Sequence, residues 1–404
     1  MKNSLGYHVP TETIGNVESI PILKLLAFTL AGFITIMTET IPAGLLPQIS
    51  RDLNISESLA GQMVSVYALG SVIAAIPIVA ATRSWSRRPL FLLAIGGLLI
   101  FNSLTALSSS YMVILASRLV AGMSAGVIWG VLAGYARNMV PGHLQGRALA
   151  IVGIGQPIAL CFGVPLGTWL GSLFDWRGVF WIMSALALIS IGWVRTAIPD
   201  FLGQKETRHQ SVKEIFLIPG IRSILWVIFL WILAHNILYT FISPYLTSVG
   251  LGNRVDLVLL LFGVSSIVGI WITGIWVDRS LRLLTILSLT GFALAAILIG
   301  VGSYHPWIVL LGITLWGMTF GGAPTLLQTT IADTAGNGAD VAQSMLVTVF
   351  NLAVAGGGLI GGGLLQQLGP SSFTIIMFAL AILSILVVFQ AKSHGFKPSR
   401  RNED

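Results

Sequence analysis

Long apolar segments separated by short polar turns run through almost the whole chain. A helix needs about 20 residues to cross the hydrocarbon core of a bilayer, where lipid-exposed sheet edges do not occur. The pattern therefore predicts an all-α polytopic membrane protein with twelve transmembrane helices. These predicted spans 1 to 12 cover residues 22–48, 58–81, 89–108, 111–136, 146–172, 176–196, 222–248, 255–277, 282–302, 305–330, 339–366 and 372–391.

The longest polar connection, 197–221, lies at the middle of the chain and separates six predicted spans from six. We interpret it as a cytosolic linker between an N-terminal six-helix bundle (22–196) and a C-terminal one (222–391). Residues 1–21 are polar and carry no small-residue cleavage site before the first apolar run, so they predict a cytosolic tail and not a signal peptide. Residues 392–404 form a second short cytosolic tail.

The two predicted bundles resemble each other at an offset of about 195 residues. Gly122-Met-Ser-Ala-Gly126 in span 4 matches Gly317-Met-Thr-Phe-Gly321 in span 10. The same offset pairs Gly163 with Gly358, Gly167 with Gly362 and Gln156 with Asn351. Two such pseudo-symmetric bundles enclose a cavity at the membrane midplane and expose it to either side by rocking, which indicates a carrier.

Composition supports a lipid environment. The 404 residues are 55% hydrophobic and 9% charged, whereas soluble domains carry about 25% charged residues. The mean hydropathy is +0.88. The single cysteine, Cys161, excludes a disulfide framework.

The basic residues orient the predicted spans. If the N-terminus is cytosolic, 18 of the 22 lysines and arginines fall in cytosolic loops and tails. Three fall in outer loops, namely Arg51, Arg177 and Arg254. This asymmetry predicts that both termini are cytosolic. Because the positive charge lies in short loops between apolar runs, the net charge of +7 does not indicate nucleic-acid binding.

Two charged residues lie well inside predicted spans, Glu39 in span 1 and Arg118 in span 4. Measured along each helix from the outer ends of these spans, they lie about 12 Å and about 10 Å deep, and so at similar depth. Intramembrane charges usually face a cavity or a partner. One interpretation is a permanent structural pair; the other is that Glu39 carries or gates a proton, or meets a cationic substrate, while Arg118 tunes its affinity.

His235 in span 7 is a weaker proton-coupling candidate, since a core histidine with satisfied hydrogen bonds is the simpler explanation. We expect a substrate cavity lined from spans 1, 4, 5, 7, 10 and 11. Interhelical hydrogen bonds or packing would also explain any one of its polar and aromatic candidates. These candidates are Thr38, Trp129, Gln156, Asn236, Tyr239, Trp316, Gln328 and Asn351.

Glycines at helical spacing let membrane helices approach closely, and prolines bend them. The sequence predicts either static packing or a moving seam between the halves, formed by spans 5 and 11. The seam residues would be Gly153, Gly155, Pro157, Gly163, Pro165, Gly167, Gly358 and Gly362.

The sequence contains no phosphate-cradling loop of the Walker type, so ATP is not the expected energy source. The histidines show no metal-site spacing, and no catalytic constellation of an enzyme appears. We therefore expect no cofactor and no metal, with the proton gradient as the source of energy.

Three motifs resemble the Major Facilitator Superfamily over nearly the whole chain. The segment from Ser117-Arg118 to Gly126 resembles the motif whose arginine that family implicates in proton transfer. Gly153-Ile-Gly155-Gln-Pro157 with Gly163-Val-Pro165-Leu-Gly167 resembles its antiporter motif. Thr38-Glu39-Thr-Ile-Pro42-Ala-Gly44-Leu-Leu-Pro47 is similar to the twelve-span drug:proton antiporter branch, especially arabinose- and sugar-efflux permeases.

The resemblance also implies a cytosolic gate after spans 2 and 8, formed by Arg83, Arg87, Arg88, Asp278 and Arg279. This chain departs from the family pattern at Thr82, which stands where an aspartate is usual. A charge relay in the first half is therefore in doubt, although the fold is not.

The resemblance implies a proton-coupled exporter of small organic solutes such as sugars, nucleosides or drugs, in a bacterial inner membrane. Its partners would be a small-molecule substrate, protons and membrane lipids, and it would be a monomer. An importer or uniporter of the same fold is the first alternative. A non-transporting membrane sensor is the second, from a different class.

Overall fold

The structure is a computed structural model that describes residues 20–397 except 76, 83, 203–210 and 303–304. Within this part of the chain, helices occupy almost every position and no strand occurs. The helices are α1 (Ile22–Leu53), α2 (Glu57–Ala75), α3 (Pro77–Ala81), α4 (Arg87–Leu107), α5 (Tyr111–Arg137), α6 (Gln145–Gly153), α7 (Gly155–Ile158), α8 (Val164–Ala197), α9 (Val212–Phe216), α10 (Ile221–Thr240), α11 (Ile242–Ser248), α12 (Val255–Val301), α13 (Pro306–Gly321), α14 (Ala323–Ala335), α15 (Ala339–Gln367) and α16 (Ser372–Gln390).

These helices are consistent with twelve spans. Among the described residues, nine helical segments are long and apolar enough to cross a membrane. Two of them, with 56 and 50 residues, are too long for one crossing, and their backbone leaves helical geometry at Asp175 and Ser280. Each covers two predicted spans, and α2 with α3 accounts for the remaining one.

Prolines explain why three predicted spans are interrupted. A proline lacks the N–H that would bond to the carbonyl four residues earlier. For Pro157 that carbonyl belongs to Gly153, where α6 ends. For Pro244 it belongs to Thr240, where α10 ends. Between α7 and α8, one π-helical turn covers Ala159–Gly163, just before Pro165. In span 10, Pro324 lies four residues after Phe320, and α13 ends at Gly321. Predicted spans 5, 7 and 10 are thus each built from shorter helices, and α1 extends five residues beyond the predicted 48.

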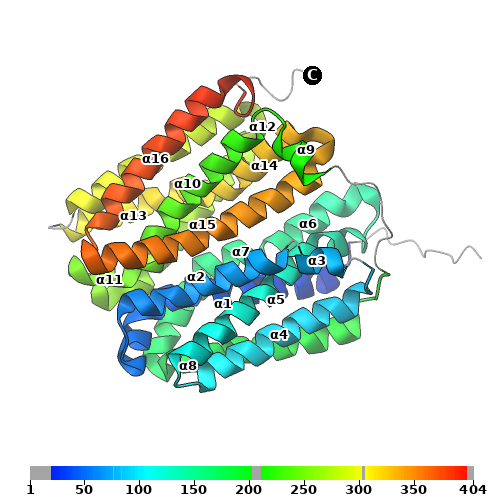
Figure 1. Ribbon diagram of the computed structural model, residues 1–404, viewed down its shortest axis with the longest axis horizontal. Coiled ribbons are helices and arrows are strands. Elements are labelled where there is room, and N and C mark those ends of the chain that lie inside the picture. Colours follow the sequence, from blue (N-terminus) through cyan, green and yellow to red (C-terminus); the bar gives the residue numbers. More distant parts are fainter. Residues whose placement is uncertain (1–19, 76, 83, 203–210, 303–304, 398–404) are drawn as a thin grey trace, which may run out of the picture.

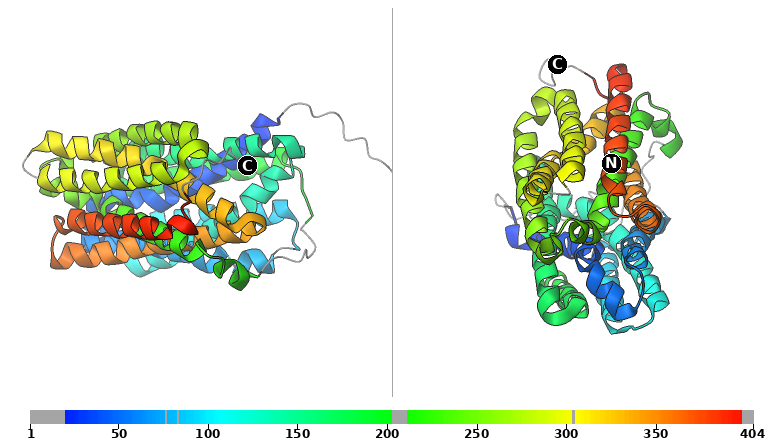
Figure 2. Two further views of the ribbon diagram at one scale, coloured as in Figure 1. Left: turned by 90° about the horizontal axis from the view of Figure 1, so that it is seen from above. Right: turned by 90° about the vertical axis from the view of Figure 1, so that its left-hand side faces the viewer.

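The helices form two groups. Figure 1 shows α1–α8 in its lower part and most of α10–α16 in its upper part, and Figure 2 shows the same bundle lengthwise and end-on. We call the end that carries Ile22, the described residues 197–202 and 211–221, and the last described residues the linker end. The opposite end, with the turns at 54–56 and 249–254, is the distal end.

The internal repeat appears in the helix contacts. α5 crosses α2 where glycines leave no room for a Cβ atom, and α13 crosses α12 in the same way. At both crossings a Cβ on the glycine would collide with a backbone carbonyl of the neighbouring helix. The glycine–carbonyl pairs keep the 195-residue offset: Gly122 with Tyr67 and Gly317 with Phe262, then Gly126 with Ser71 and Gly321 with Ser266.

Three of the glycines expected in the seam of span 5 face span 1 of the same half. A Cβ at Gly155 would meet the carbonyl of Thr29, and one at Gly163 or Gly167 would meet side chains of α1. These glycines therefore pack span 5 against span 1 within the same half. Gly153 has no neighbouring atom in reach of a Cβ.

The span 11 glycines lie between the halves. A Cβ at Gly358 would meet Ser65 of α2, and one at Gly362 would meet Ser58 and Gln62 of α2. Figure 1 shows α15 and α2 side by side. Span 11 thus packs against span 2 of the other half, and the π-helical turn of span 5 packs against span 8. Spans 5 and 11 therefore both lie between the halves, and movement along them stays a prediction.

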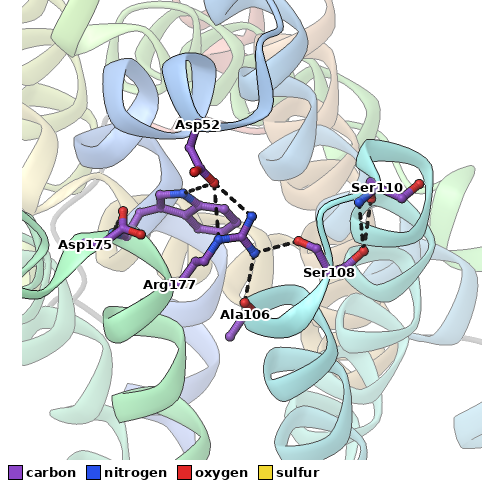
Figure 3. A network of polar contacts seen from close by, with 7 residues as sticks. Asp52, Ala106, Ser108, Ser110, Asp175 and Arg177 are labelled. Carbon is purple, nitrogen blue, oxygen red and sulfur yellow. Dashed lines mark hydrogen bonds and ion pairs between the residues drawn. The ribbon is translucent and has the colours of Figure 1, made fainter.

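A polar network joins the ends of three spans at the distal end (Figure 3). Arg177 donates to Asp52 at 2.8 and 3.2 Å and to the carbonyl oxygens of Ala106 and Ser108 at 2.9 and 2.6 Å. The indole of Trp176 also donates to Asp52, at 3.1 Å. One arginine thereby connects the end of α1, the end of α4 and the bend in α8.

Candidate functional site: a cavity between the halves

A cavity of about 160 Å³ lies between the two halves. Its walls come from α1, α5 and α7 on one side and α10, α14 and α15 on the other, which are the six spans expected to line it. Five residues singled out in the sequence lie on these walls. The lining residues are Ile36, Glu39, Trp129, Gln156, Ile228, Pro324, Leu327, Gln328, Leu346, Val347, Phe350 and Asn351.

The cavity is displaced toward the linker end. Trp129 lies eight residues from the linker end of α5, and Asn351 lies twelve residues into α15 from the same end. On the distal side the halves touch. The Gln62 amide donates to the carbonyl of Gly358 at 3.1 Å, and a Cβ at Gly61 would collide with the ring of Phe241. The halves are therefore closed beyond the cavity at the distal end.

Glu39 is the acidic residue of the cavity wall. Its residue is 8% exposed, so it is largely buried but in contact with the cavity space. Glu39 and Arg118 are both described, and no ion pair joins their side chains. The structure therefore does not contain the Glu39–Arg118 salt bridge of the structural-pair interpretation.

Arg118 lies at the same depth as Glu39 but bonds to backbone. It donates to the carbonyl oxygens of Met63, at 3.1 Å, and of Glu39, at 3.4 Å. Its guanidinium also lies over the Tyr67 ring, 4.6 Å from the centroid, and near Phe180 at 5.6 Å. A fully buried cation is thus held by dipoles and aromatic faces, and its Nη1 has no hydrogen-bond partner in the described protein.

Thr38 and Asn236 do not line the cavity. The Thr38 hydroxyl accepts from the Asn102 amide at 2.9 Å, which ties span 1 to span 3. The Asn236 amide donates to the carbonyl of Ile232 at 2.9 Å, and its Cβ packs against Gly357. Both residues make the interhelical or local contacts that were the alternative explanation.

His235, Tyr239 and Trp316 form an aromatic cluster beside the cavity. The His235 ring lies parallel to Phe320, with centroids 3.6 Å apart, and 5.2 Å from Trp316. Tyr239 stacks on His235 at 5.0 Å. None of these three residues lines the cavity, so a role in proton coupling or substrate binding stays a prediction.

The expected gate residues lie at the linker end, and Arg83 lies outside the described residues. The backbone N–H groups of Arg87 and Arg88 donate to the Phe201 carbonyl and the Asp200 carboxylate, at 2.8 and 2.9 Å. These bonds anchor the start of α4 to the chain that follows α8. Thr82 donates its hydroxyl to the carbonyl of Ile78, and Asp278 and Arg279 are exposed near the bend in α12.

Apolar cavity residues were not singled out in the sequence. Ile36 precedes Glu39 by one turn, Val347 precedes Asn351 by one turn, and Pro324 precedes Gln328 by one turn. Residues three or four apart share one helix face. Taking each polar candidate together with its helical neighbours would have found these residues.

The arrangement suits a polar solute more than a metal or a covalent reaction. Amide groups from both halves, one carboxylate and one indole surround an otherwise apolar space. Such a wall orients a small molecule by a few hydrogen bonds while apolar groups exclude water. Within the described residues, no group of three or more His, Cys, Asp or Glu side chains is placed to hold a metal ion.

Two related helical halves around a cavity at their interface define a polytopic membrane carrier. The sequence model of the family described as the Major Facilitator Superfamily matches residues 28–344. The chain therefore belongs to that superfamily and is a multi-pass membrane transporter.

Curated relatives cover most of the chain. The purine ribonucleoside efflux pump NepI of Escherichia coli is 30% identical over 357 residues, which cover 87% of this chain and 90% of that protein. The transcription regulatory protein OpdE of Pseudomonas aeruginosa is 29% identical over 376 residues, 91% of this chain and 93% of that protein.

A solved structure supports the fold. The crystal structure of the human organic anion transporter MFSD10 (TETRAN) has a TM-score of 0.62 and covers 91% of this chain and 96% of that one. With 18% sequence identity, this likeness bears on the fold alone.

Proposed function

We propose that this protein exports a small neutral organic solute, of the purine nucleoside class, in exchange for protons. The observation that supports this most is that Glu39 borders the cavity while Arg118, at the same depth, is bonded to carbonyls instead of to its carboxylate. A carboxylate without a fixed cationic partner is free to bind and release a proton. The similarity to a purine ribonucleoside efflux pump supports the substrate class.

Alternating access would connect the two tasks. The basic residues gather at the linker end, which we therefore assign to the cytosol of a bacterial cell, with both termini there. In the present arrangement the cavity is displaced toward that end and the distal end is closed. Solute would enter from the cytosol, and a proton would enter from the other side and reach Glu39 once the distal end opens. The proton gradient alone would supply the energy, to a monomer in the inner membrane.

Proton flux in proteoliposomes tests the proposal. Inosine, adenosine, pentoses and amphipathic antibiotics are added in turn, and internal pH is recorded for wild type and Glu39→Gln. Glu214→Gln is a matched control, because Glu214 lies in a capping box at α9, where glutamine serves equally well. We expect a purine nucleoside to drive proton movement in wild type and in the control but not in Glu39→Gln.

A second readout separates loss of coupling from loss of folding. Exchange of labelled for unlabelled nucleoside needs the cavity but no net proton movement, so Glu39→Gln should retain it. Proton flux that survives in Glu39→Gln would contradict the role of Glu39. Nucleoside transport without any proton movement would favour a uniporter.

A regulatory role is a second candidate, because the relative OpdE is named a transcription regulatory protein. If no compound of the panel is transported or exchanged by folded wild type, the regulatory candidate gains support and the exporter is contradicted.

A further inference from the structure

The aromatic cluster around His235 continues the cavity wall toward the closed distal end. On α10, Ile228 lines the cavity, and Trp231 and His235 follow on the same helix face one and two turns further on. On the opposite side, Pro324 lines the cavity, and Phe320 and Trp316 precede it at four-residue steps. A solute moving from the cavity to the distal end would meet these residues next.

Four polar atoms in this cluster have no hydrogen-bond partner in the described protein. They are the indole N–H groups of Trp231 and Trp316, Nδ1 of His235 and the hydroxyl of Tyr239. All four side chains are more than nine-tenths buried. Buried polar groups in proteins are nearly always bonded, since each one left unbonded costs stability. If these rings served packing alone, phenylalanine would serve better.

The cluster also lies where the two halves meet. Phe262 contacts His235, Tyr239 and Trp316, and the next residue, Gly263, lies directly against the backbone of Cys161 in the N-terminal half. Cys161 belongs to the π-helical turn of span 5. Movement of one half against the other would therefore change the surroundings of this cluster.

We propose that His235, Tyr239 and Trp316 form a second binding site, which takes the planar nitrogen heterocycle of the solute on its way to the distal end. This inference rests on the proposed function and specifies how the base of a nucleoside is recognised. Aromatic side chains stack on the faces of a base. The indole N–H, the hydroxyl and the imidazole nitrogen offer the donors and acceptors that the edge of a purine requires.

Two variants that each remove one unpartnered polar atom test this site. Tyr239→Phe and Trp316→Phe remove the unpartnered polar atoms, and neither removes a hydrogen bond within the described protein. Tyr245→Phe is the control, because that buried hydroxyl donates to the Ile299 carbonyl at 2.7 Å. Binding of inosine to the purified full-length protein is measured by calorimetry, and thermal unfolding is recorded for each variant.

We expect Tyr239→Phe and Trp316→Phe each to weaken inosine binding several-fold, up to about tenfold, the usual effect of one lost hydrogen bond. The unfolding temperature of Tyr239→Phe should not fall, whereas Trp316→Phe also removes buried ring volume and should lose some stability. Tyr245→Phe should show the reverse pattern, with lower thermal stability and unchanged affinity.

Two results would overturn the inference in different ways. Wild-type binding of inosine with unchanged affinity in both variants would exclude this second site and leave the proposed function standing. A folded wild-type protein that binds no nucleoside would overturn the proposed function, and this inference with it.

Discussion

The two helix crossings at the centre of the halves have the same backbone and different chemistry. In the N-terminal half, Gly122 of α5 lies on the Tyr67 carbonyl of α2; in the C-terminal half, Gly317 of α13 lies on the Phe262 carbonyl of α12. The 195-residue offset relates all four positions. Around the first crossing, the structure places a buried arginine, Arg118.

Around the second crossing, the position equivalent to Arg118 is Ile313, which is fully buried. Trp316 and the other aromatic side chains fill the space there, with Phe262 and Trp316 centroids 4.6 Å apart. The comparison teaches that the same close glycine contacts hold both halves together, whereas the side chains around them differ: a buried charge in one half and an aromatic cluster in the other. We infer that the two halves have separate roles: the N-terminal half binds and releases the proton, and the C-terminal half recognises the base.

Replacing the buried cation tests this division most severely. In Arg118→Met, the buried positive charge no longer acts on the proton affinity of Glu39. We therefore expect proton-coupled transport to fall on the order of 5- to 150-fold, which corresponds to the usual range of coupling free energies. Thermal stability should hold, since an apolar side chain avoids burying a charge and often replaces one without loss. Proton flux and thermal unfolding of purified protein measure the two effects.

Ile313→Met is the matched control in the other half. A volume-conserving apolar exchange costs less than about 1.5 kcal/mol, so folding and coupling should both persist. Arg118→Met could instead lower thermal stability while the molecules that remain folded transport normally. That result would make the arginine structural and would contradict separate roles for the two halves.

The glycine crossings should respond alike, because they serve the same purpose. Gly122→Ala and Gly317→Ala each add a Cβ that would collide with a backbone carbonyl, so the helices must separate. Overpacking of this kind costs about 1–3 kcal/mol. We expect similar losses of thermal stability in the two variants.

Gly134→Ala provides the reference for this pair, since a Cβ there meets nothing within 4 Å and should change stability little. A large difference between Gly122→Ala and Gly317→Ala would show that the two crossings are not energetically equivalent, despite their shared geometry.

The sequence predicted the spans, the repeat and the shared depth of Glu39 and Arg118, because these depend on segment length and on position along a helix. It did not predict which face of span 5 turns toward span 1, or that Thr38 turns to Asn102. Helices that are apolar all round have no polar face to fix their rotation about the axis. The partner of Arg118 was unpredictable for a related reason, since every helix offers backbone carbonyls and sequence spacing does not show which one lies nearby.

The smallest effect should come from making the two crossings more alike. Tyr67 and Phe262 are equivalent and differ by one hydroxyl, which Tyr67 donates to the Thr35 carbonyl at 3.0 Å. Tyr67→Phe removes that bond and keeps an aromatic face under Arg118, so we expect a loss of about 1 kcal/mol in stability with proton coupling preserved. Thermal unfolding and proton flux again measure both quantities. Loss of coupling in a stable Tyr67→Phe protein would place this hydroxyl on the proton path, and proton handling would then extend beyond Glu39 and Arg118 to span 2.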